Sequence, residues 1–228
     1  MNETEVPLPE KPELLVEHYQ KTYELTNQFW SQRNQIFLIL VSAVGIAAIL
    51  TYSPADTNPL LVAWLAKLLD IKEESQVMAL HRSFPFALLQ GIMLIVIFYL
   101  MVNLFHRSLY VLRNYAYLGK LEHEIRASLK FSKQSVGFTR ESYYYWNKRP
   151  FLLSTVKWAY IVLLGGLLGI FLWGRLAADC AAKNIQLLVV DIVAALPIVA
   201  YFCGYTWYTL RWDTDKISLA KKPKVNAV

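Results

Sequence analysis

Ionisable side chains inside long apolar stretches are the first residues of this sequence that could do chemistry. Asp191 is the only acidic residue in the apolar stretch 185–210. An ionisable group in lipid is costly and usually faces protein, water or an ion pathway. Asp191 is therefore a candidate ion-facing residue at the outer mouth of a cation pathway. The alternative is an interfacial residue that pairs with Lys183 or Arg175.

A second candidate is the segment 138–150, FTRESYYYWNKRP, which combines basic residues with four consecutive aromatic residues. Such a segment can stack a base and hold a phosphate, or it can lie on anionic lipid beside a membrane span. Because the sequence contains no Gly-rich phosphate loop, we favour lipid and expect no nucleic-acid partner. The candidate binding residues are Arg140, Tyr143, Trp146, Lys148 and Arg149.

Catalytic and metal chemistry are not expected. The four histidines form no HExxH arrangement and the two cysteines form no CxxC arrangement. Glu122, His123 and Glu124 are consecutive, but consecutive residues on a helix point in different directions. We therefore predict that the protein is not an enzyme and uses no cofactor. Cys180 and Cys203 are expected to be free thiols, unless Cys180 pairs with its copy across an oligomer axis.

These residues must be positioned by four long apolar stretches. A helix needs about 20 residues to span a bilayer, and only a helix satisfies its own backbone hydrogen bonds in lipid. The sequence therefore predicts an all-α integral membrane protein with four transmembrane helices and cytoplasmic helical extensions. The four stretches are 34–55, 83–105, 151–174 and 185–210.

Apolar residues continue at helical spacing beyond the first two stretches. The first helix is predicted to run from about Glu13 to Tyr52, and the second from Phe84 or Pro85 to about Lys130. Their stripes outside the membrane should pack together. Between the two spans, a turn is predicted at Asn58–Pro59, followed by a short amphipathic helix at 60–71 along the outer interface.

Lysine and arginine decide which side each connection faces. The segment from His106 to Arg149 holds nine basic and three acidic residues, whereas the loop from Ser53 to Arg82 holds three basic and four acidic residues. The positive-inside rule then predicts both termini in the cytoplasm. The expected parts are an N-terminal amphipathic helix (1–33), spans one and two (34–105), a basic helix and loop (106–149), spans three and four (150–210) and a basic tail (211–228).

Small residues mark a helix-packing surface. Gly165 and Gly169 form a GxxxG pair with Gly166 beside them, and small residues four apart let two helices approach closely in lipid. The first span offers a matching small surface around Gly45. These glycines are expected to pack helices within one bundle or between subunits, or to leave room for a pore.

The plan of four short spans with basic cytoplasmic helices resembles small bacterial membrane effectors of conflict systems. The resemblance implies an inner-membrane protein of anti-phage defence that an intracellular sensor triggers to open a pore or perturb the bilayer. We therefore expect a homo-oligomer in the lipid bilayer that converts a cytoplasmic signal from a soluble partner into ion passage or membrane perturbation. The alternative is a non-conducting anchor or scaffold that recruits that soluble partner.

Overall fold

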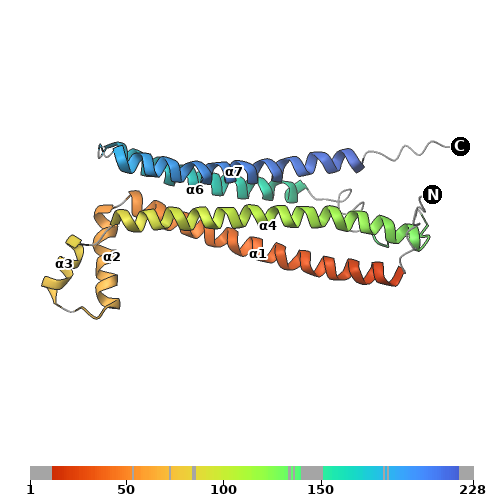
Figure 1. The fold of residues 1–228 in the computed structure, drawn as a ribbon, viewed down its shortest axis with the longest axis horizontal. Helices are drawn as coiled ribbons and strands as arrows, with labels where there is room; N and C mark the ends of the chain where they lie inside the picture. Colours follow the sequence, from red (N-terminus) through yellow and green to blue (C-terminus); the bar gives the residue numbers. More distant parts are fainter. Residues whose placement is uncertain are drawn as a thin grey trace, which may run out of the picture. The chain divides into compact units, whose positions relative to one another are not determined.

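The structure is a computed structural model, and in the part of the chain that it describes every regular element is a helix. The described residues are 12–52, 54–71, 73–83, 86–132, 135, 137–139, 151–181, 183 and 185–220. The helices labelled in Figure 1 are α1 (Pro12–Tyr52), α2 (Pro54–Leu68), α3 (Glu74–Ser83), α4 (Phe86–Ser128), α6 (Phe151–Ala181) and α7 (Ile185–Ala220). Helices α1, α4, α6 and α7 are long and apolar enough to cross a membrane. The predicted all-α fold with four membrane-spanning helices is confirmed.

Contacts divide the chain into two compact units, each of which draws on several helices. The polar unit comprises Met1–Arg33, His106–Val156 and Trp207–Val228. The apolar unit comprises Asn34–Phe105 and Lys157–Thr206. On which side of a membrane the polar unit lies stays a prediction.

The polar unit is built on two apolar stripes, one at the start of α1 and one at the end of α4. Leu15 of α1 packs with Leu121 and Ile125 of α4 in one buried cluster, and Tyr19 and Phe138 cover it. Each stripe alone would be exposed to water, so the two helices stabilise each other by burying them. The predicted packing of the two extensions is confirmed.

Side-chain contacts along the pair show that α1 and α4 run antiparallel in the polar unit. His18 Nε2 and Tyr117 Oη are 2.9 Å apart. Nearer the other end of the pair, the rings of Phe29 and Tyr110 lie with their centroids 4.2 Å apart. As the residue numbers along α1 increase, the numbers of their contact partners on α4 decrease.

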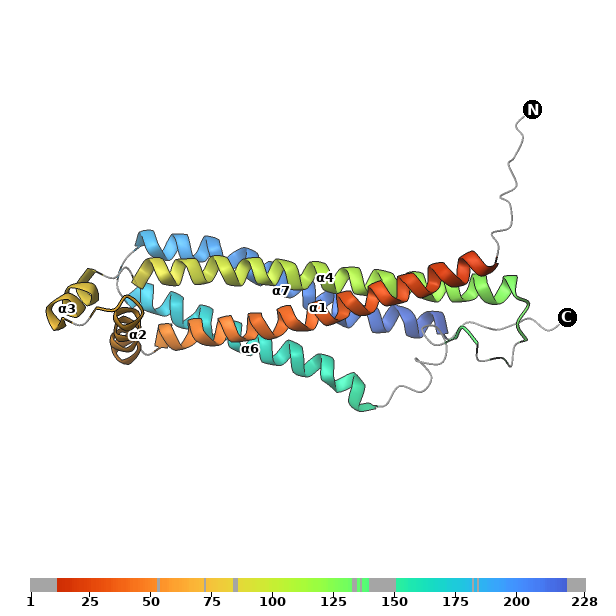
Figure 2. The same cartoon turned by 90° about the horizontal axis from the view of Figure 1, so that it is seen from below.

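The apolar unit contains segments of the four long helices, and side-chain contacts give the relative directions of three of them. Figure 2 shows the four long helices after a 90° turn of the view in Figure 1. Near one end of the spans, the centroids of the Phe37 and Tyr160 rings lie 4.7 Å apart. At the other end, Tyr52 Oη donates a 2.8 Å hydrogen bond to the Ile170 carbonyl. Helices α1 and α6 therefore run parallel, and α6 and α7, joined by a short connection, run antiparallel.

The connection between the first two spans differs from the prediction. The turn expected at Asn58–Pro59 is wrong, because α2 begins at Pro54 and contains Pro59. Proline is well tolerated at the first helical position, and Pro59, in the second turn, removes one backbone hydrogen bond, to the Ala55 carbonyl, without ending the helix. The helix predicted at 60–71 ends at Leu68, since Asp70 adopts a φ of 53° in the turn that follows.

A further helix in this connection was not predicted. Helix α3 packs against α2, and α2 buries Val62 and Ala66 while Trp64 stays exposed. The sequence of α3, ESQVMALHRS, is too short and polar to stand out by hydropathy. Packing against α2 stabilises α3 as a helix.

The last two helices are longer than the apolar stretches that predicted them. Helix α6 continues through Gly174 to Ala181, so Arg175, Asp179 and Cys180 are helical residues and not loop residues. Helix α7 continues to Ala220, so the first ten residues of the expected tail are helical. The apolar pattern ends where several polar residues follow, whereas backbone hydrogen bonding can continue through polar residues.

Candidate functional site

Three charged side chains are buried in the apolar unit. Arg175 and Asp179 of α6 are each 6% exposed, and Asp191 of α7 is 4% exposed. Arg175 and Asp179 are four residues apart, so they lie on one face of α6. Because α7 runs back antiparallel to α6, Asp191 in its second turn comes opposite that face. We call these residues, together with Gln90 of α4, the buried charge cluster.

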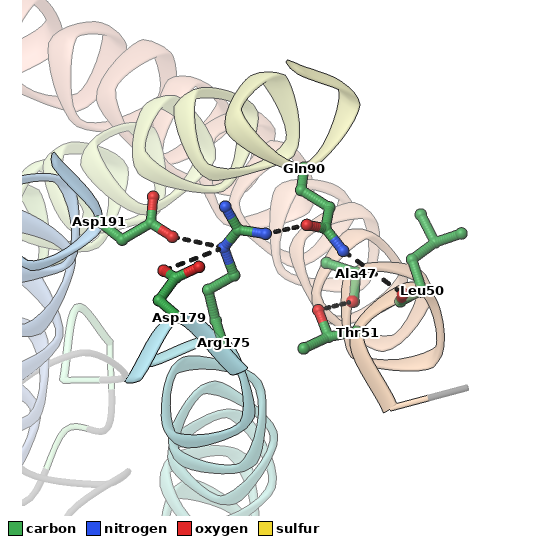
Figure 3. Close-up of polar contacts among 7 residues, drawn as sticks. All are labelled: Ala47, Leu50, Thr51, Gln90, Arg175, Asp179 and Asp191. Carbon is green, nitrogen blue, oxygen red and sulfur yellow. Dashed lines mark hydrogen bonds and ion pairs between the residues drawn. The ribbon is translucent and has the colours of Figure 1, made fainter. Parts of the chain in front are cut away.

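The guanidinium of Arg175 lies at the centre of this cluster (Figure 3). Its Nε donates a hydrogen bond to Asp191 Oδ2 and lies 3.9 Å from Asp179 Oδ2. Its Nη1 donates to Gln90 Oε1. The Gln90 Nε2 in turn donates a 3.5 Å hydrogen bond to the Leu50 carbonyl of α1. One side chain therefore links α6, α7 and α4, and Gln90 extends the link to α1.

The structure shows which of the two predicted partners, Lys183 or Arg175, pairs with Asp191. Its partner is Arg175, while Lys183 is exposed. The predicted pairing with Arg175 is therefore observed, and both members of the pair are more than nine-tenths buried. Removing one partner of a buried pair lowers the stability of a protein by about 3–5 kcal/mol. An exposed pair contributes only about 0–1 kcal/mol to stability.

The burial of Asp179 was not predicted from the hydropathy of the sequence, which placed this residue in a loop. Its Oδ2 is buried and has no hydrogen-bond partner, although Arg175 lies within ion-pair distance. Buried polar atoms are hydrogen-bonded in the large majority of cases. An available signal was the spacing of Arg175 and Asp179, which is typical of one helical face and not of a loop.

Gly174 allows α1 to pack closely beside the cluster. A Cβ at position 174 would lie 2.6 Å from the hydroxyl oxygen of Tyr52, the group that donates to the Ile170 carbonyl. A larger residue would displace the Tyr52 ring and its hydrogen bond. This role could not be predicted from the sequence, because it depends on where Tyr52 of another helix lies.

The predicted packing glycines have different surroundings. A Cβ at Gly165 would lie 2.7 Å from Cζ of Phe202 on α7, so Gly165 permits a close approach within the apolar unit. A Cβ at Gly166, Gly169 or Gly45 would meet nothing within 4 Å. A contact between copies of the chain through Gly169 stays a prediction.

Substituting the two glycines of the GxxxG pair should separate these roles. Gly165→Ile is expected to destabilise the apolar unit by about 1–3 kcal/mol, because its side chain would overlap the Phe202 ring. Gly169→Ile should change the unfolding free energy by less than about 0.5 kcal/mol but reduce the oligomer in mild detergent. Detergent denaturation and light scattering measure the two effects. An unchanged oligomer in Gly169→Ile would contradict the association role.

The polar unit contains a buried carboxylate of its own. Glu122 is fully buried, and its Oε1 accepts a 3.0 Å hydrogen bond from Tyr19 Oη. His123 and Glu124 are exposed. The three consecutive residues therefore do not converge on one site. Among the described residues, no group of three or more His, Cys, Asp or Glu side chains could hold a metal ion.

Two further sets of predicted residues have simpler outcomes. Cys180 and Cys203 are free and exposed thiols. The predicted lipid-binding residues lie outside the described part of the chain: Arg140, Tyr143, Trp146, Lys148 and Arg149.

Comparisons with protein-family models, with curated proteins and with solved structures found no match.

Proposed function

We propose that this protein is a homo-oligomeric membrane protein that converts a signal received by its polar unit into ion passage or membrane perturbation. The observation that carries the proposal is the burial of Arg175, Asp179 and Asp191 in the apolar unit. Ionisable residues within membrane segments are costly, and they mark substrate and ion pathways.

Stability alone gives a weak reason for such a cluster. Replacing a buried ion pair by well-packed apolar residues is often neutral, or stabilising by about 1–4 kcal/mol. A protein that only anchors a partner would therefore be served as well by apolar side chains at these positions. The resemblance in plan to effectors of bacterial conflict systems supports an inner-membrane role in anti-phage defence.

The second candidate is a non-conducting anchor that recruits a soluble partner. Exposed apolar side chains in the polar unit favour it, since Leu14 is 58% exposed and Leu129 41% exposed. Isolated exposed apolar residues are common on soluble surfaces. The buried charge cluster, which an anchor does not need, makes ion passage the better-supported function.

Potassium release from liposomes containing the purified full chain tests the proposal. Wild-type protein is expected to release potassium faster than empty liposomes. The double variant Arg175→Met/Asp191→Leu removes the central ion pair and should reduce release at least tenfold at equal insertion. Lys67→Gln, an exposed change in α2, should leave it unaffected. Inserted wild-type protein that releases no potassium would favour the anchor.

The proposed orientation places both termini in the cytoplasm, and cysteine labelling tests it. In a chain carrying Cys180→Ser and Cys203→Ser, Ser75→Cys in α3 should react with an impermeant maleimide added outside intact cells. Ser132→Cys, after the end of α4, should stay unlabelled until the cells are opened. Both native side chains are exposed, so burial does not protect either position. Labelling of position 132 from outside would reverse the orientation.

A further inference from the structure

The buried charge cluster has an uneven charge. Arg175 supplies one positive charge, and Asp179 and Asp191 supply two negative charges if both are ionised. The sum is then −1, at positions that are 4–6% exposed. An uncompensated carboxylate in a poorly solvated site is strongly unfavourable and becomes neutral instead.

The neighbouring helices supply no second positive charge through their described bonds to this cluster. On α4, Gln90 is neutral and accepts from Arg175. On α1, Thr51 donates to the Ala47 carbonyl at 2.8 Å, and Tyr52 donates to the Ile170 carbonyl. Lys183, between α6 and α7, is exposed. Arg175 is therefore the cation that the two carboxylates share.

The two carboxylates share that cation unequally. Arg175 Nε donates its hydrogen bond to Asp191, and its other described hydrogen bond, from Nη1, goes to Gln90. Asp179 Oδ2 faces the same Nε at 3.9 Å and accepts no hydrogen bond (Figure 3). The excess negative charge therefore falls on a buried oxygen that has no donor.

We propose that Asp179 and Asp191 together bind one exchangeable proton, which is held mainly on Asp179 while Asp191 stays ionised against Arg175. The added proton makes the cluster neutral, and it turns one oxygen of Asp179 into a donor. The proposal goes beyond ion passage, because the site would exist in a protein that conducts nothing. Loss of the proton restores the charge of −1 and weakens the link between α6 and α7.

Infrared spectroscopy of the full chain in detergent detects the proton directly, through the C=O stretch of a protonated carboxyl group. Exposed carboxyl groups lose this band at about pH 4, so wild-type protein should keep one carboxyl equivalent of it above that range and lose this equivalent as the pH rises further. Asp179→Asn and Asp191→Asn should each lack that equivalent, because each variant pairs one carboxylate with Arg175 at zero net charge. The matched control is Glu122→Gln, which removes the other buried carboxylate described above and should leave the Asp179-dependent band in place.

Thermal unfolding gives a second readout with the same logic. Because the folded cluster favours the protonated form, its contribution to wild-type stability should be largest when the shared proton is bound and should fall as the pH rises. Asp179→Asn is protonation-independent at this position, so its midpoint should fall less over the same range.

Three results would overturn the proposal. The first is a wild-type chain that loses the whole band over the range in which exposed carboxyl groups ionise, and the second is a band that persists above that range in both aspartate variants. The third is a wild-type midpoint that rises with sodium at constant ionic strength, with choline as the control, which would show that a metal cation balances the charge.

Discussion

Replacing Arg175 with methionine is expected to lower the free energy of unfolding by about 3–5 kcal/mol, because removing one partner strands the buried charge of the other. Asp191 would lose its hydrogen bond, and Asp179 would lose its nearest described cation. Denaturation of the purified full chain in mixed detergent micelles measures the loss.

Two companion variants show whether charge is the cause. Adding Asp179→Asn and Asp191→Asn to Arg175→Met removes all three charges and should recover most of the lost stability, since contacting residues are not additive. Lys67→Met removes an exposed charge in α2 and should change stability by less than about 0.5 kcal/mol. If the triple variant were as unstable as the single one, packing and not charge would explain the effect.

Ile125→Ala should open the polar unit. Ile125 is fully buried against Leu15 and Leu121, and such a truncation costs about 2–5 kcal/mol. Because this cluster joins α1 to α4 in the polar unit, hydrogen exchange should accelerate in both helix segments. Amides of the apolar unit should keep their protection.

The exposed neighbour Glu124 supplies the matched control for that prediction. Glu124→Ala shortens a side chain on the same turn of α4 without removing a buried contact, so exchange should stay close to that of the wild type. Equal exchange in Ile125→Ala and the wild type would show that the two helix segments do not depend on this cluster for their stability.

The sequence allowed the helices to be predicted wherever an apolar pattern ran without interruption. The first helix was predicted from Glu13 to Tyr52 and is observed from Pro12 to Tyr52. A stripe at the helical period in 13–33 leads without Gly or Pro into the apolar stretch that begins at Asn34, so the pattern covers the whole length. Pro59 misled the prediction, because a proline near a helix start and a proline in a turn look alike in sequence.

The candidate site was predicted only in part. Asp191 stood out because it is an isolated charge in an apolar stretch. Arg175 and Asp179 did not, because they follow the end of such a stretch, where charges are common. Their burial depends on α6 continuing as a helix and on α7 returning beside it, which is tertiary information. Gly174 was missed for a similar reason, since its role depends on where Tyr52 of another helix lies.

The short connection between α6 and α7 has a consequence for how the chain enters the membrane. Helix α6 ends at Ala181 and α7 begins at Ile185, so Arg175 and Asp191 are only 16 residues apart and both lie near the tip of one hairpin. In the proposed orientation, this tip is the part that the insertion machinery must translocate. Two helices that pair before translocation carry Arg175 and Asp191 across as a neutralised pair, whereas helices translocated singly would expose each charge to hydrocarbon in turn.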